Sequence, residues 1–210
     1  KYQRYIKDYL RCVASVDDNI GRILDYLDES GLAENTIVIY SSDQGFFLGE
    51  HGMYDKRWMY EESLSTPLVM RWSGQIKPGT RIEKLTQNID FAPTFLEIAG
   101  VPIPEEIQGD SLIPLMNGET PSDWRDAIYY HYYEKGQHNV ARHEGVSSER
   151  YKLIHYYGTQ DWELLDLETD PQEMMSVYSD PKYSDIVSVM KGKLSDLRIQ
   201  FQVPKLKNGR

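Results

Sequence analysis

The sequence predicts an α/β fold with a mostly parallel sheet and flanking helices, followed by a small α+β subdomain with an antiparallel sheet and one helix. In residues 1–125, a long helical pattern, two short apolar runs and a second helical pattern follow one another, as in α/β domains. After about residue 126, strand-like stretches come in sequence before one final helix. We therefore predict two domains, residues 1–125 and residues 126–210.

The first two elements are a long helix and a short strand. Apolar residues recur at steps of three and four from Ile6 to Leu27, which is the spacing of an amphipathic helix. Gly31 follows at a position suited to a helix C-cap. The β-branched and apolar run from Thr36 to Tyr40 is typical of a buried parallel strand.

The rest of the first domain contains a second strand and a second helix. The apolar run from Pro67 to Trp72 predicts the strand. Asp90 is placed to be the N-cap of the helix, with Pro93 in the first turn and Gly100 at its end. Residues 101–125 are rich in proline and glycine, and we expect them to connect the two domains.

The second domain starts with aromatic, strand-like sequence. Tyr129 to Tyr133 is dense in tyrosine, Tyr151 to Tyr157 alternates as a half-buried strand does, and the apolar stretch from Trp162 to Leu167 follows. A helical pattern then runs from Ile186 to Phe201. This order predicts antiparallel strands packed against one helix.

The composition excludes several classes of protein. A net charge of −10 argues against general nucleic-acid binding, which needs a basic surface. No apolar run approaches the length that spans a bilayer. The single cysteine excludes an intrachain disulfide. We expect no nucleic-acid partner and no membrane partner, and an anionic substrate would need positive groups gathered locally.

The segment from Thr36 to Lys56 carries the strongest indication of a site. The strand ends at Asp43 and Gln44, and ligands of open α/β sheets bind beyond the carboxyl ends of the strands. Both side chains offer hard oxygen atoms, which suit Ca²⁺ or Mg²⁺. Glycines follow at Gly45, Gly49 and Gly52, where they permit close backbone approach.

Several blocks of this chain resemble the type I, formylglycine-dependent sulfatases of the alkaline-phosphatase-like superfamily. In order, they are SSDQG, GEHGMYDKRWMYEES, STPLVMRW, DFAPTFLEIAG and WELLDLETDPQE. The resemblance extends from about Tyr9 to Pro171 and points to the C-terminal portion of such an enzyme. It implies hydrolysis of sulfate esters by a formylglycine made from cysteine or serine, with one bound Ca²⁺. The blocks look most like glycan sulfatases, with a preference for N-acetylglucosamine-6-sulfatases.

The resemblance assigns roles to residues of the glycine-rich segment. Asp43 and Gln44 match the carboxylate and amide that ligate the cation; its other ligands are expected outside this chain. Phosphatase relatives have histidine after that aspartate and bind zinc, so Gln44 favours a calcium sulfatase. Lys56 matches a lysine that contacts a sulfate oxygen and stabilises charge there. His51 either lines the cleft or hydrogen-bonds the loop.

No residue of this chain matches the nucleophile. Formylglycine formation needs cysteine or serine with proline two positions later and arginine four positions later. Cys12 has neither, and we expect it in a helix core. Ser65 has Pro67 but Val69 in place of arginine. We therefore predict that this fragment is inactive alone.

The second domain is expected to contribute to substrate binding. His138, Arg142 and His143 precede the strand that starts at Tyr151, and we place them in a loop that reaches the cleft. Cationic and aromatic groups suit a sulfated sugar or an aryl sulfate ester. The family resemblance implies a periplasmic or secreted protein.

Two other functions remain open from the sequence. One is a phosphodiesterase or phosphonate hydrolase of the same superfamily, which a different nucleophile and two metals would identify. The other is a non-catalytic glycan-binding domain.

Overall fold

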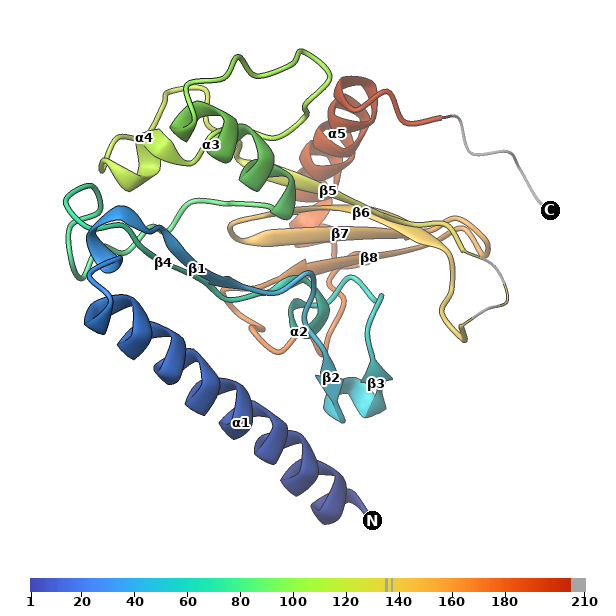
Figure 1. The fold of residues 1–210 in the computed structure, drawn as a ribbon. Helices are drawn as coiled ribbons and strands as arrows, with labels where there is room; N and C mark the ends of the chain where they lie inside the picture. Colours follow the sequence, from blue (N-terminus) through green and yellow to red (C-terminus); the bar gives the residue numbers. More distant parts are fainter. Residues whose placement is uncertain (135, 137, 205–210) are drawn as a thin grey trace.

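The computed structural model describes residues 1–134, 136 and 138–204 of the chain (Figure 1). The helix α1 (Tyr2–Glu29) starts the chain and is followed by a short 3₁₀ turn at Ala33–Asn35. Gly31 has a φ of 72°, the left-handed conformation that commonly ends a helix. The helix predicted from the apolar spacing is therefore confirmed.

Helix α1 contributes little to a core in this structure. None of its residues is buried, and Val13 and Val16 are about half exposed. Cys12 is exposed as well, so its expected place in a helix core was wrong. The helix contacts the following segment through aromatic rings, such as Tyr5 with Tyr54 at 5.6 Å between ring centroids.

The two strands that the sequence predicts in the first domain pair with each other in antiparallel fashion. Strand β1 (Val38–Ser41) lies beside β4 (Leu68–Arg71), with Val38 opposite Arg71. The expectation of a mostly parallel sheet was therefore wrong for the described residues, whose strands all pair antiparallel. An apolar run specifies a strand but not the direction of its partner, and both strands are only half-buried here.

A compact loop region joins β1 to β4. It contains a small hairpin of β2 (Phe47–Leu48) and β3 (Tyr54–Asp55), with a 3₁₀ turn at Glu50–Gly52 between its strands. The one-turn helix α2 (Glu61–Leu64) follows. Of the residues that the sequence identifies as a site, His51 lies in this hairpin, Asp43 and Gln44 precede it, and Lys56 follows it.

The helix predicted after Asp90 is present as α3 (Phe91–Ile98), preceded by a 3₁₀ turn at Asn88–Asp90. Asp90 occupies the N-cap position as predicted, but its side chain does not cap α3. The carboxylate instead accepts the backbone N–H groups of Gln87 and Asp110 and binds the Arg125 guanidinium. Helix α4 (Ile113–Met116) follows and buries Leu115 and Met116.

The last part of the chain forms a four-stranded antiparallel sheet in the order β5-β6-β7-β8. Its strands are β5 (Ala127–Tyr132), β6 (His143–Ser148), β7 (Tyr151–Tyr156) and β8 (Asp161–Asp166). A 3₁₀ turn at Pro181–Tyr183 leads into α5 (Ser184–Gln200). The antiparallel sheet with one helix is confirmed, and the boundary between residues 125 and 126 stays a prediction.

The two faces of this sheet pack against different parts of the chain. On one face, Val146, Leu153 and Leu164 contact Met190 and Leu194 of α5. On the other face, Ile154 and Leu165 contact Phe47, Met59 and Tyr60 of the loop region (Figure 1). This second face therefore supports the candidate site. Among the described residues, no helix has both the length and the apolar character to cross a bilayer.

Candidate functional site

The candidate site consists of two short segments that converge on Ser63 of α2. The backbone N–H of Gly45, next to Gln44, donates to the carbonyl oxygen of Ser63 at 2.8 Å. The backbone N–H of Arg57, next to Lys56, donates to the Ser63 hydroxyl oxygen at 3.0 Å. Ser63 is buried. One residue therefore holds the predicted cation-binding pair and the predicted sulfate-binding lysine in a fixed relation.

Asp43 and Gln44 lie directly beyond the end of β1, as the sequence predicts. Asp43 is exposed and Gln44 is half-buried. The Gln44 amide nitrogen donates to the Asp43 carboxylate at 3.2 Å, so the two side chains lie next to each other. The side chain of Asn88 donates to the backbone carbonyl of Asp43 at 2.8 Å and so fixes the backbone of the pair.

Gly45 is the residue that lets this segment approach α2. A Cβ atom at this position would lie 2.0 Å from the carbonyl oxygen of Glu62 and 3.0 Å from that of Ser65. No side chain fits there, so the glycine is needed for close backbone contact. The glycine-rich character noted in the sequence is therefore explained at this position by packing.

Lys56 lies between two residues with strained backbone. Asp55 has a φ of 78° and Arg57 a φ of 90°, and positive φ is unfavourable for residues other than glycine. Such strain is concentrated at functional sites. The Arg57 guanidinium binds the Asp55 carboxylate. Among the described residues, the half-buried Lys56 makes no ion pair, so its ammonium is available to an anion.

His51 packs into the loop rather than standing free in a cleft. Its ring stacks on Tyr60 at 4.5 Å between ring centroids, and its Nε2 atom lies 3.4 Å from a carboxylate oxygen of Glu62. Only 9% of its side chain is exposed. Burial raises the pKa of the neighbouring Tyr60 to about 12. This geometry favours the loop-supporting role, and substrate contact by His51 stays a prediction.

His143 is enclosed by aromatic rings. It is the first residue of β6 and is fully buried, so its predicted place in a loop was wrong. Its ring stacks on Trp58 at 5.7 Å and on Tyr130 at 5.6 Å. Burial lowers the pKa of His143. In this position the ring supports the segment that carries Lys56, because Tyr130 also donates to the carbonyl oxygen of Arg57 at 2.7 Å.

The other two predicted substrate residues lie in the connection between β5 and β6. The His138 side chain is 36% exposed, and its Nε2 atom lies 3.8 Å from the carboxylate of Glu134. Arg142 places its guanidinium 5.4 Å from the centre of the Tyr157 ring. Both side chains reach solvent, but no described contact joins either of them to Lys56. Their roles stay predictions.

The donors of the chain match a calcium ion in kind but not in number. Asp43 and Gln44 supply a carboxylate and an amide oxygen, whereas Ca²⁺ takes about six to eight oxygen ligands. Within the described part of the chain, no cluster of three or more His, Cys, Asp or Glu residues is placed to hold a metal ion. The pair therefore suits one side of a calcium site that needs further ligands.

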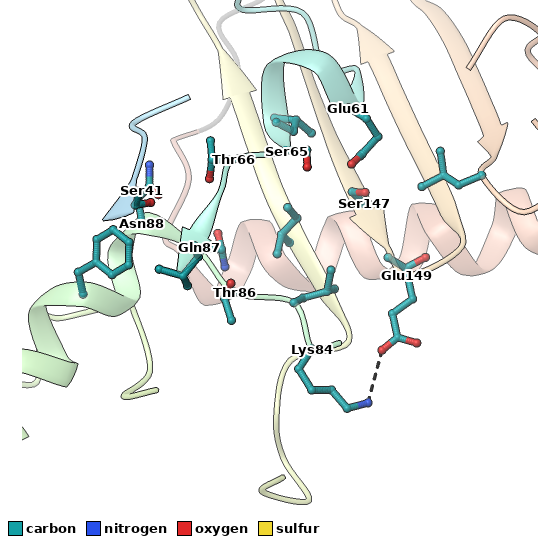
Figure 2. A pocket seen from close by; sticks show the side chains of 17 residues that line it. Ser41, Glu61, Ser65, Thr66, Lys84, Thr86, Gln87, Asn88, Ser147 and Glu149 are labelled. Carbon is teal, nitrogen blue, oxygen red and sulfur yellow. Dashed lines mark hydrogen bonds and ion pairs between the residues drawn. The ribbon is translucent and has the colours of Figure 1, made fainter. Parts of the chain in front are cut away.

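A polar pocket of about 260 Å³ lies between the first domain and the second. Figure 2 shows Ser41, Thr66 and Asn88 on one side and Ser147 and Glu149 on the other. An ion pair between Lys84 and Glu149 crosses its rim. Neither Asp43 nor Lys56 lines this pocket.

An aromatic groove of about 660 Å³ runs beside the segment that carries Lys56. Trp58, Tyr156 and Tyr178 line it. Glu163 lines it as well, and its carboxylate accepts hydrogen bonds from the hydroxyl groups of Tyr60 and Tyr156. Flat rings next to hydrogen-bonding groups suit the apolar faces and hydroxyl groups of a sugar.

Sequence reasoning missed the supporting residues of the site. Ser63 lies in a helix of one turn, and nothing in its sequence context indicates that it bonds two separate loops. The strain at Asp55 and Arg57 is equally invisible in the sequence. The only available indication was their position on either side of Lys56.

The sequence is similar to known sulfatases. The family described as "N-sulphoglucosamine sulphohydrolase, C-terminal" matches residues 49–200. The chain is 48% identical over 206 residues to an N-acetylglucosamine-6-O-sulfatase of Bacteroides thetaiotaomicron. This alignment covers 96% of this chain and 37% of that relative. The chain thus spans about two-fifths of the length of the relatives it matches.

Solved structures agree with the sequence comparison. One solved structure, of a protein in complex with its substrate D-glucosamine-2-N,6-O-disulfate, matches this chain with a TM-score of 0.94 and 46% sequence identity. The match covers 97% of this chain and 42% of that chain. The phosphonate monoester hydrolase of Agrobacterium radiobacter is more distant, with a TM-score of 0.80 and 28% identity over 90% of this chain and 40% of that one. The resemblance seen in the sequence blocks is confirmed, and the chain belongs to the sulfatase family.

Proposed function

We propose that the full-length protein containing this chain hydrolyses sulfate esters of glycans, and that N-acetylglucosamine 6-sulfate is the preferred unit. The observation that carries the proposal is the convergence of the Asp43–Gln44 pair and Lys56 on Ser63. The similarity to an N-acetylglucosamine-6-O-sulfatase over nearly the whole chain supports the choice of sugar. The nucleophile is proposed to come from outside this chain.

Lys56 is proposed to neutralise charge on the sulfate group. The S–O bond breaks with build-up of negative charge on the leaving oxygen, and a fixed ammonium stabilises that charge. The hydrogen bond from Arg57 to Ser63 and the one from Tyr130 to Arg57 restrict the backbone that carries Lys56. The backbone that carries Lys56 is therefore restrained before the substrate binds, which is an arrangement that favours catalysis.

Asp43 and Gln44 are proposed to contribute two oxygen ligands to one Ca²⁺ ion. The ion, when bound, polarises the sulfate oxygens. The exposed carboxylate of Asp43 and the amide oxygen of Gln44 support this role. The hydrogen bond from Asn88 to the Asp43 carbonyl holds the pair in position as the ion binds.

The aromatic groove is proposed to bind the sugar ring or a neighbouring ring of the glycan. Trp58 lines the groove and is only two residues from Lys56 in the chain, which supports a role of the groove next to the proposed sulfate site. Glu163 supplies an acceptor for sugar hydroxyl groups.

The test is a kinetic assay of the full-length protein with N-acetylglucosamine 6-sulfate and with a phosphonate monoester. We expect kcat on the sulfate ester to fall by about 100- to 1,000-fold in Lys56→Ala. Lys84→Ala is the matched control, because Lys84 forms only an exposed ion pair with Glu149. Preferred turnover of the phosphonate would favour the alternative hydrolase and contradict the proposal.

Two further measurements address the metal and the fragment. Removal of calcium with a chelator is expected to abolish activity, and added Ca²⁺ is expected to restore it in the wild type but not in Asp43→Ala. The 210-residue chain alone is expected to hydrolyse no aryl sulfate. Metal-dependent turnover by that chain would show that its own residues suffice.

A further inference from the structure

The search for a further role starts from a lysine that the proposed chemistry does not use. Lys152 is the second residue of β7 and is completely buried, which is rare for lysine unless it is paired. Its ammonium donates to the carboxylate of Glu173 at 2.5 Å and to that of Glu61 at 2.8 Å. The Glu173 side chain is 1% exposed, and that of Glu61 is 44% exposed.

The three charged side chains connect the C-terminal sheet to the first turn of α2. Glu61 is the first residue of α2, and its backbone N–H donates to the second carboxylate oxygen of Glu173 at 2.6 Å. Glu173 therefore binds both the buried ammonium and a helix N–H group that has no acceptor within the helix. The helix is thus fixed from two directions by residues that lie far away in the sequence.

The conformation of Glu173 shows that its position is specified. Its φ is 54°, a left-handed conformation that is unfavourable for glutamate. Burial raises the pKa of this carboxyl group, while Lys152 opposes the rise. A strained, buried acid persists only when its surroundings hold it in place. Here the ammonium and the helix N–H are what hold it.

The anchor lies two residues from the centre of the candidate site. Glu61 and Ser63 belong to the same turn of α2, and Ser63 receives the N–H groups of Gly45 and Arg57. A shift at Glu61 is therefore transmitted to both halves of the site. A misplacement of about 1 Å can reduce turnover by about 100-fold.

We propose that Lys152 is a positioning residue that fixes α2 to the C-terminal sheet through Glu173 and Glu61 and thereby sets the placement of Gln44 and Lys56. The proposal rests on the site assigned above. It gives the C-terminal sheet a specific task, because β7 then holds the loops that carry the proposed chemistry.

The experiment measures hydrogen exchange and kinetics in the full-length protein. In Lys152→Met we expect the Gly45 and Arg57 amides to exchange about tenfold faster, because their acceptor residue is less restrained. Exchange within α5, on the opposite face of the sheet, is expected to stay unchanged. We expect kcat to fall by at least about tenfold and KM to change by less than about threefold.

Three variants keep the test decisive. Lys152→Met leaves the Glu173 carboxylate buried without a partner, so Lys152→Met/Glu173→Gln removes both charges and preserves folding. Glu61→Gln changes only a half-exposed side chain. It is expected to accelerate exchange of the Gly45 and Arg57 amides and to lower kcat, each by about threefold. Lys193→Met is the matched control, because Lys193 of α5 pairs with the exposed carboxylate of Asp126 and neither residue lines the aromatic groove. It is expected to leave both loop amides and kcat unchanged.

The outcomes separate this proposal from the proposed function. If the Gly45 and Arg57 amides exchange at the wild-type rate in the folded double variant and in Glu61→Gln, the positioning role is overturned. If the wild-type protein hydrolyses no sulfate ester, the sulfatase proposal fails, and the exchange rates still decide whether Lys152 positions the loops. Equal acceleration of exchange in α5 would identify a general loss of stability and also overturn the proposal.

Discussion

Replacing Gly45 with alanine is expected to separate the cation-binding segment from α2. The new Cβ would lie 2.0 Å from the carbonyl oxygen of Glu62, whereas ordinary contact begins at 3.4 Å. The backbone must therefore move by more than 1 Å. Overpacking costs about 1–3 kcal/mol, and the hydrogen bond to Ser63 contributes about 1 kcal/mol. We expect the free energy of unfolding to decrease by about 2–4 kcal/mol.

Urea denaturation followed by circular dichroism measures this change, and Gly21→Ala is the matched control. Gly21 lies within α1, and a Cβ there meets nothing within 4 Å. The same substitution is expected to stabilise the chain by up to about 1 kcal/mol, because alanine favours helices. Equal effects of the two substitutions would refute the argument that close packing requires Gly45.

Three other substitutions test the packing around the site. Asp90→Ala removes the buried partner of the Arg125 guanidinium, which keeps only the exposed Asp110, and it removes the acceptor of the Gln87 and Asp110 backbone N–H groups. Urea denaturation is expected to show a loss of about 3–5 kcal/mol. Burial lowers the pKa of His143 below its ordinary value of 6.5, so under acid conditions the unfolded chain binds more protons than the folded chain. The free energy of unfolding is therefore expected to fall as the pH decreases from about 7 to 5. In His143→Phe this fall is expected to be smaller. Lys191→Met removes a cation–π contact with Trp162, and its thermal unfolding should show a loss of about 1 kcal/mol.

The elements with regular apolar spacing were predictable from the sequence. The pattern from Ile6 to Leu27 corresponds to α1, and that from Ile186 to Phe201 corresponds to α5 within a few residues. Strand β6 was not predicted, because its buried residues include the polar side chains of Glu144 and Ser147. Their burial depends on partners from other elements, such as Arg198 of α5 for Glu144. No local pattern encodes such partners.

The sequence predicts the individual residues of the candidate site, because they lie within one short segment of the chain. Asp43, Gln44 and Lys56 are identifiable by their order after a strand. Their common attachment to Ser63 was not, because it depends on one backbone carbonyl and one hydroxyl group. The contact between Lys152 and Glu61 joins residues that are 91 positions apart. Such contacts follow from the fold and not from the local sequence.

The location of α5 on the sheet face opposite the loop region has a practical consequence for attaching the protein to a surface or a dye. Ile199 near the end of this helix is 75% exposed, so an Ile199→Cys substitution offers a reactive thiol remote from Ser63. The native Cys12 is also exposed and has to be replaced by serine first. A protein immobilised through α5 presents the loop region that carries Lys56 to solution, which permits binding measurements on an oriented layer.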